Sequence, residues 1–132
     1  EASLDMKVLE QFERKAVVIF GLKALFERIT SENKKKLALL IEKGEAIYKI
    51  HFFMADGVAS FKEYAYEPWY KRHVSGSDGI WIGDGIADQY SLKLNKMSSE
   101  YYDDIGSDYG YVVERGKAVL TKLLSSTPEE EY

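Results

Sequence analysis

The chain has 132 residues, a formal net charge of −4 and 45% hydrophobic residues, a balance typical of a globular protein. Its length favours one α/β domain, residues 1–124, followed by a polar tail, residues 125–132. The sequence has no cysteine, which excludes disulfides and thiolate metal sites. Its basic residues do not form the concentrated face typical of nucleic-acid binding, and no apolar run approaches the roughly 20 residues of a membrane helix.

The first half of the chain predicts a strand, a helical crossover and a second strand. Residues 3–14 predict a helix with Leu4, Val8 and Phe12 on one face. The next segment, 15–20, has five consecutive apolar residues, as in a parallel strand buried on both faces. Helices are expected directly after Gly21 and again from Ser31, as N-cap, before a second apolar strand over 49–55. This order predicts a right-handed βαβ unit.

The second half predicts shorter elements separated by turns. A helix is expected from Ser60 until Pro68 interrupts it. A third short buried strand, a turn, a half-buried strand and a last helix are expected in the order 80–82, 83–85, 90–94 and 98–105. The final element is a hairpin, in which Arg115-Gly116 forms a two-residue turn that places Glu114 opposite Lys117.

No catalytic, metal or cofactor residue is predicted. The phosphate-binding pattern G-x-x-x-x-G-K-[S/T] is absent, and Gly21 stands at the strand end where a nucleoside triphosphatase would carry its magnesium-associated acid. His51, in an apolar strand, is expected to be a core residue, and His73 a surface residue. ATP is expected as a ligand only if another domain completes the site.

Aromatic residues are the more informative candidates for a binding site. Four of them fall within seven residues around Pro68, more than one inner helix face accommodates, so at least one is expected to be exposed. Recruitment of a peptide or helix competes here with simple packing over the sheet. The predicted partner-binding residues, which include one tryptophan from the later strand, are Tyr64, Tyr66, Trp69, Tyr70 and Trp81.

The order of these segments resembles FtsK/SpoIIIE-type translocase domains, and specifically the last ATPase domain of the EssC-type membrane coupling proteins of type VII secretion. The first half of the resemblance is carried by residues 17–20, 37–44 and 50–55, and the second by residues 79–83, 86–89, 97–100 and 109–113. It covers residues 8 to 124. It implies a RecA-like three-layer module with a mostly parallel sheet and a C-terminal β-hairpin.

The resemblance further implies a part of a longer, membrane-anchored protein, at the cytoplasmic face of the membrane. Expected partners are secreted helical proteins and neighbouring ATPase domains, with oligomers in the full-length protein. Because the phosphate loop and the strand-end acid are missing, the function expected is non-catalytic support of substrate recognition or assembly. Two alternatives stay open: a nucleotide hydrolase completed by a neighbouring domain or subunit, and a free-standing cytoplasmic regulatory protein.

Overall fold

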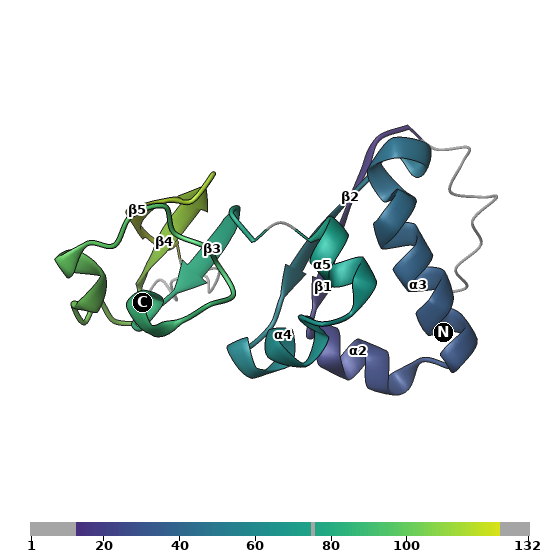
Figure 1. The fold of residues 1–132 in the computed structure, drawn as a ribbon, viewed down its shortest axis with the longest axis horizontal. Coiled ribbons are helices and arrows are strands. Elements are labelled where there is room, and N and C mark those ends of the chain that lie inside the picture. Colours follow the sequence, from purple (N-terminus) through teal and green to yellow (C-terminus); the bar gives the residue numbers. More distant parts are fainter. Residues whose placement is uncertain (1–12, 75, 125–132) are drawn as a thin grey trace, which may run out of the picture. The chain divides into compact units, whose positions relative to one another are not determined.

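The structure, a computed structural model, describes residues 13–74 and 76–124. The fold is mixed α/β, and the span expected to be one domain consists of two compact units, which divide after Val74 (Figure 1). We call them unit 1 and unit 2. Most of the helix predicted over 3–14 and the whole predicted tail, 125–132, lie outside the described residues; Glu13 and Arg14 are described and are not helical.

Unit 1 has a strand, helix, strand order followed by two short helices. Its elements are β1 (Lys15–Phe20), α2 (Leu22–Arg28), α3 (Ser31–Lys43), a π-helical turn (Gly44–Tyr48), β2 (Ile50–Ala55), α4 (Val58–Tyr64) and α5 (Pro68–His73). The strands β1 and β2 pair in parallel, with Lys15 opposite Ile50 and Phe20 opposite Ala55, so the predicted parallel strand pair with a helical crossover is confirmed. The α3 helix is capped by Thr30, whose hydroxyl accepts from the Asn33 N–H, and not by Ser31 as predicted.

The core of unit 1 lies between its helices and one face of the β1–β2 sheet. Alternate strand residues such as Ile19 and Ile50 face inward, because successive side chains of a strand point to opposite faces. Figure 1 shows α2, α3 and α5 on the same side of the strand pair. The core side chains are Ile19, Leu22, Phe26, Leu37, Ile41 and Trp69, with a neighbouring cluster of Leu40, Tyr48 and Ile50.

The prediction that both strands are buried on both faces is wrong for the outer face. Val18 is 52% exposed, Phe20 is 80% exposed and Phe53 is 55% exposed. These side chains alternate with the core residues, and no described helix covers them. A parallel sheet ordinarily has both faces covered, so this apolar surface is unusual.

Unit 2 is an antiparallel three-stranded sheet with two short helical turns. Its elements are β3 (Gly79–Ile82), the 3₁₀ turns Ile86–Asp88 and Ser99–Tyr102, β4 (Tyr109–Glu114) and β5 (Lys117–Lys122), in the sheet order β3-β4-β5. The C-terminal hairpin is confirmed, with Glu114 opposite Lys117 and positive φ at Arg115 and Gly116. The strand β3 does not extend the parallel pair, so the described residues do not form the expected mostly parallel sheet.

Side-chain hydrogen bonds shape the loops of unit 2. The turn predicted at 83–85 is confirmed, and the Asp84 carboxylate there accepts from the N–H groups of Ile105, at 2.5 Å, and Gly106, at 3.0 Å. No strand forms over 90–94. There the Gln89 side-chain amide donates to the Leu92 carbonyl and accepts from the Leu92 N–H. Both backbone groups of Leu92 are therefore hydrogen-bonded without pairing to another strand.

Candidate functional site

The carboxyl ends of β1 and β2 are where an open α/β sheet would bind a ligand. β1 is followed by Gly21, whose φ of 74° is a left-handed conformation that favours glycine over a residue with a side chain. Asp56 directly follows β2 and is the acid at the end of that strand. The two strand ends meet directly, because the Gly21 N–H donates to the Ala55 carbonyl at 2.8 Å.

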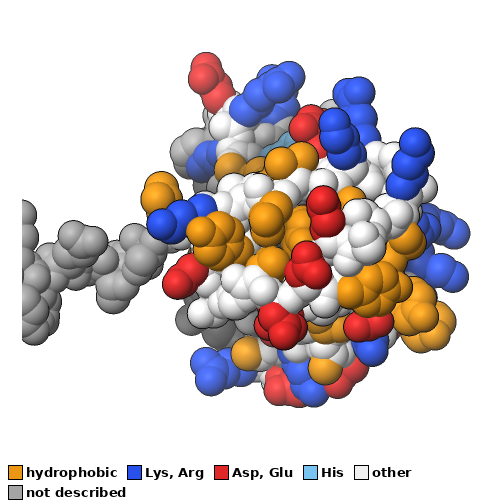
Figure 2. Space-filling view, turned by 90° about the vertical axis from the view of Figure 1, so that its left-hand side faces the viewer, with side chains coloured by type: hydrophobic (Ala, Val, Ile, Leu, Met, Phe, Trp, Pro, Cys, Tyr) orange, Lys and Arg blue, Asp and Glu red, His pale blue; other side chains and the backbone are white. Residues whose placement is uncertain are grey.

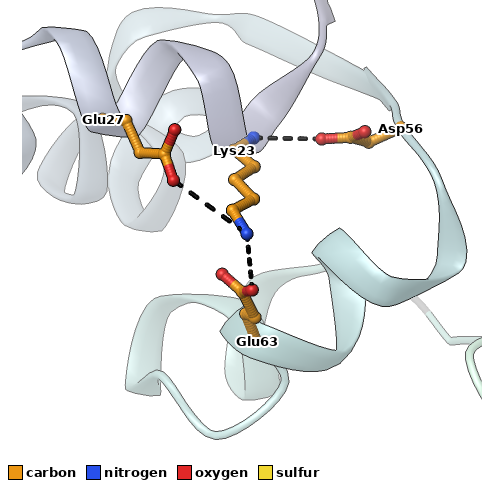
Figure 3. Close-up of polar contacts among 4 residues, drawn as sticks. All are labelled: Lys23, Glu27, Asp56 and Glu63. Carbon is orange, nitrogen blue, oxygen red and sulfur yellow. Dashed lines mark hydrogen bonds and ion pairs between the residues drawn. The ribbon is translucent and has the colours of Figure 1, made fainter.

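Asp56 acts as a helix cap. Gly21, the N-cap residue of α2, has no side chain to offer, and Asp56 supplies the acceptor from the neighbouring strand (Figure 3). Its Oδ2 accepts from the Lys23 N–H at 3.0 Å and its Oδ1 accepts from the Gly57 N–H at 2.7 Å. The hydrogen bond from the Lys23 backbone is the main reason why the pKa of Asp56 is lowered. Each carboxylate oxygen therefore already serves a structural hydrogen bond.

The side chain of Lys23 pairs with acids from two helices. Its Nζ lies 2.7 Å from Glu63 Oε1 on α4 and 4.0 Å from Glu27 Oε1 on its own helix (Figure 3). The pairing with Glu63 is the main cause of the raised pKa of Lys23. Together with Asp56, these groups are one cation and three anions, a net charge of −2. This net negative charge at the strand ends would repel a nucleotide phosphate.

The aromatic residues predicted to bind a partner lie mainly in the core of unit 1. Trp69 is only 5% exposed and stacks on Phe26, with ring centroids 5.4 Å apart and planes 5° from parallel. The ring centroid of Tyr64 lies 5.0 Å from that of Phe26, and the ring centroid of Tyr70 lies 6.2 Å from that of Phe61. Burial raises the pKa of both Tyr64 and Tyr70. In this segment the packing alternative is therefore the one that the structure shows.

Tyr66 and Trp81 complete the predicted set. Tyr66 is 84% exposed, so the expectation that at least one aromatic near Pro68 reaches the surface is confirmed. Trp81 packs on the core of unit 2 beside Ile86 and Tyr111, and its indole N–H donates to the Asp84 carbonyl at 2.9 Å. Of the five predicted residues, Tyr66 is exposed, Trp69 is buried and the other three are half-buried.

Sequence reasoning missed a different surface, on the sheet of unit 2. Along β3, β4 and β5, alternate side chains face the core, and the other side has four exposed aliphatic side chains together with Glu114, Lys117 and Thr121. The cross-strand row Ile80, Val112 and Val119 is joined by Ile82. We call this surface the aliphatic face; the exposed fractions are 61% for Ile80, 65% for Ile82, 38% for Val112 and 53% for Val119.

The composition of the aliphatic face differs from that of an ordinary solvated sheet. An antiparallel sheet with one wet face usually alternates apolar and polar residues, whereas Gly79–Ile82 has no polar side chain at all. The charges on the aliphatic side of the strands are the pair Glu114 and Lys117 at the hairpin end. The sequence signal for this face was the absence of apolar–polar alternation in residues 79–83. The same pattern also fits a strand that is buried on both faces.

Hydrophobic side chains are a visible feature of the molecular surface. Figure 2 shows exposed hydrophobic side chains with acidic side chains between them on the side that it presents.

Among the described residues, no cluster of three or more histidine, cysteine or acidic side chains could hold a metal ion. Within the same residues, no helix combines the length and hydropathy that a membrane crossing requires.

Comparisons with known proteins give no relative. No protein-family model, curated protein or solved structure matches this chain.

Proposed function

We propose that this chain is a non-catalytic, ATPase-like module of a type VII secretion coupling protein and that it supports substrate recognition or assembly. The observation that carries the proposal is the aliphatic face of unit 2, which offers four exposed branched side chains on a regular sheet. Exposed apolar surface of this kind marks sites of protein interaction. The family resemblance of the sequence supplies the secretion context.

A secreted helical protein is the partner that fits the aliphatic face best. The apolar stripe of an amphipathic helix can lie across a row of aliphatic side chains, as in helix-in-groove recognition. The Glu114 and Lys117 pair at the end of the face can orient a charged helix end without blocking the centre. Neighbouring ATPase domains are the second class of partner in this proposal.

Electrostatics at the strand ends supports a non-catalytic role. A hydrolase needs cations around the phosphates and a free acid for magnesium. Here Lys23 is engaged by Glu63, and Asp56 accepts backbone hydrogen bonds at the start of α2. The alternative of an active hydrolase would require another domain to outweigh a local charge of −2.

The RecA-like arrangement belongs to the same proposal. The strands β1 and β2 would be two neighbours in its parallel sheet, with α2 and α3 as one helical layer. The module would act at the cytoplasmic face of the membrane as part of a longer, membrane-anchored protein, and it could be oligomeric there.

A double substitution tests the recognition surface. Changing Ile80 and Ile82 to serine removes apolar area that a partner would cover, which we expect to weaken capture of small helical secretion substrates about ten- to hundredfold. Ile47→Ser is the matched control, because Ile47 is 54% exposed and belongs to unit 1. Equal affinities for all three proteins by titration calorimetry would exclude the aliphatic face as the binding surface.

A further inference from the structure

Cations gather at one end of the sheet of unit 2, around the hairpin turn Arg115-Gly116. Two loops hold this turn in place. The Arg115 N–H donates to the Asp78 carboxylate at 2.9 Å, and the Asn95 side-chain amide donates to the Arg115 carbonyl at 2.7 Å. These hydrogen bonds bring the lysines on either side of Asn95 to the turn. The exposed cations at this end, which we call the hairpin end, are Lys93, Lys96, Arg115 and Lys117.

The anions at the hairpin end do not cancel this charge. Asp78 accepts from the Arg115 N–H, and Glu114 lies opposite Lys117 in the hairpin. Four cations and two anions leave these six side chains with a formal net charge of +2. Because Lys117 lies on the aliphatic side of β5, the positive charge adjoins the aliphatic face.

Carboxylates gather at the opposite end of the same sheet. At that end, the Tyr109 carbonyl at the start of β4 accepts from the Gly83 N–H at 2.9 Å. The neighbouring Asp84 carboxylate accepts from the N–H groups of Ile105 and Gly106, which holds the preceding acidic loop in place. Exposed acids at this end, which we call the acidic end, are Asp84, Asp103, Asp104 and Asp108, with Lys122 as a cation beside them.

An apolar surface between oppositely charged ends fits a partner whose charges run in the opposite order. We infer that the aliphatic face binds an amphipathic helical segment in one direction, with the acidic end of the segment at the hairpin end and its basic end at the acidic end of unit 2. This inference rests on the proposed function and adds the charge pattern of the partner. The helix dipole favours the same direction when the acidic end of the segment is its C-terminus, which carries partial negative charge.

The size of the aliphatic face favours a single helix over a second copy of this chain. The six residues of β4 span about 20 Å, which is the length of a helix of about 13 residues. Four partly exposed aliphatic side chains offer much less than the roughly 800 Å² per partner that a standard protein interface buries. With so small an apolar contact, the charges at its two ends set the direction and the selectivity of binding.

Synthetic peptides test the charge pattern with the full chain. Two helical peptides of about 14 residues share a leucine stripe. One has lysines at its N-terminal end and glutamates at its C-terminal end, and the other has glutamines at all of these positions. We expect the charged peptide to bind about tenfold more tightly at low salt, measured by fluorescence anisotropy. The two affinities should converge at ~0.5 M salt, because exposed charges are screened there.

A charge-reversal variant locates the source of this preference. Lys96→Glu with Lys117→Glu reverses the charge at the hairpin end and should remove the preference for the charged peptide. Lys34→Glu with Lys35→Glu is the matched control, since it makes the same change of net charge at two exposed lysines of α3 in unit 1. The control should keep the preference. Equal loss in both variants would mean that binding responds to net charge and not to the hairpin end.

A spin label on the charged peptide determines its direction on the unmodified chain, so this measurement does not depend on the folding of any variant. A nitroxide at the acidic end of the peptide should broaden the amide signals of Lys96 and Arg115 more strongly than those of Asp104 and Asp108. The reverse pattern, or equal broadening at both ends of the sheet, would contradict the inferred direction.

The outcomes separate this inference from the proposed function. If both peptides bind equally, and Ile80→Ser with Ile82→Ser weakens both, the aliphatic face binds a helix without recognising its charges, and only this inference fails. If neither peptide binds, or if the changes of Ile80 and Ile82 have no effect on binding, both fail. A dimer of this chain that the same changes abolish would mean that a second copy covers the face, which would also overturn the inference.

Discussion

Asp56 shows how one residue can look catalytic by position and yet be structural. It lies at a strand end, where acids often bind magnesium, but it caps a helix whose N-cap residue is a glycine. The sequence could not reveal this, because the cap crosses from β2 to α2 and the two residues are 33 positions apart. By contrast, the sequence did show that position 21 is a glycine and not an acid. The positive φ of Gly21 gives the physical reason for glycine there.

Replacing Asp56 should destabilise unit 1. Asp56→Ala leaves the Lys23 N–H without its acceptor, and loss of a helix cap typically costs about 1 kcal/mol of unfolding free energy. Urea unfolding, followed by Trp69 fluorescence in a Trp81→Phe background, measures this cost. Asp104→Ala, at an exposed acid, is the control, and an equal effect of both changes would contradict the capping role.

The destabilisation by Asp56→Ala should depend on pH. The folded-state pKa of Asp56 is lowered below its unfolded value of about 3.9, so the charged form stabilises the fold. This contribution is complete above about pH 5 and is lost as the pH falls through the folded-state pKa. The difference between the two proteins in urea should therefore shrink from pH 7 toward pH 2, and a constant difference would refute the electrostatic part of the cap.

Trp69 was predicted to be a contact residue and is instead a core residue. We expect Trp69→Ala to lower the unfolding free energy of unit 1 by about 3–5 kcal/mol, because it leaves a cavity beside Phe26. The unfolding of unit 2, followed by Trp81 fluorescence, should keep its midpoint, because the two units are separately compact. A stable variant with unchanged unit 1 would show that Trp69 does not hold this core.

At the scale of elements, local signals were predictable and long-range pairing was not. The hairpin was found because Arg115-Gly116 is a local turn signal, and the β1–β2 pair because a helix-length segment separates two apolar strands. The residues of β4 that pair with β3 lie 28 to 34 positions farther along the chain, and a four-residue apolar strand fits a parallel or an antiparallel sheet equally well. The aliphatic face was missed because apolar residues on both faces of a strand predict burial on both faces.

The pairing of β3 with β4 depends on Gly110. An added Cβ at this position would collide with the backbone carbonyl of Trp81, which cannot move without breaking the ladder. We expect Gly110→Ala to abolish the ordered β3 pairing, seen as loss of amide protection at Ile80 and Ile82 in hydrogen exchange. Gly57→Ala is the control, because a Cβ there meets nothing within 4 Å. Retained protection in Gly110→Ala would contradict the described register.

At the scale of the whole molecule, two small units each leave an apolar sheet face exposed. Marginal stability makes such surfaces costly to keep, so each is expected to have an occupant. The proposed function assigns a helical partner to the aliphatic face of unit 2. The mixed α/β character followed from the sequence, whereas the expected mostly parallel sheet does not form among the described residues. Exposure depends on which segments pack together, which no local pattern encodes.

We propose that this chain binds protein and not nucleotide, and one titration of isotope-labelled full chain tests this proposal most directly. Amide chemical shifts are recorded while either a small helical secretion substrate or ATP with magnesium is added. The account predicts that the substrate shifts residues around Ile80, Ile82, Val112 and Val119 and that ATP gives no saturable change. Saturable ATP-dependent shifts at Gly21 and Asp56, with no response of the aliphatic face to substrate, would contradict it.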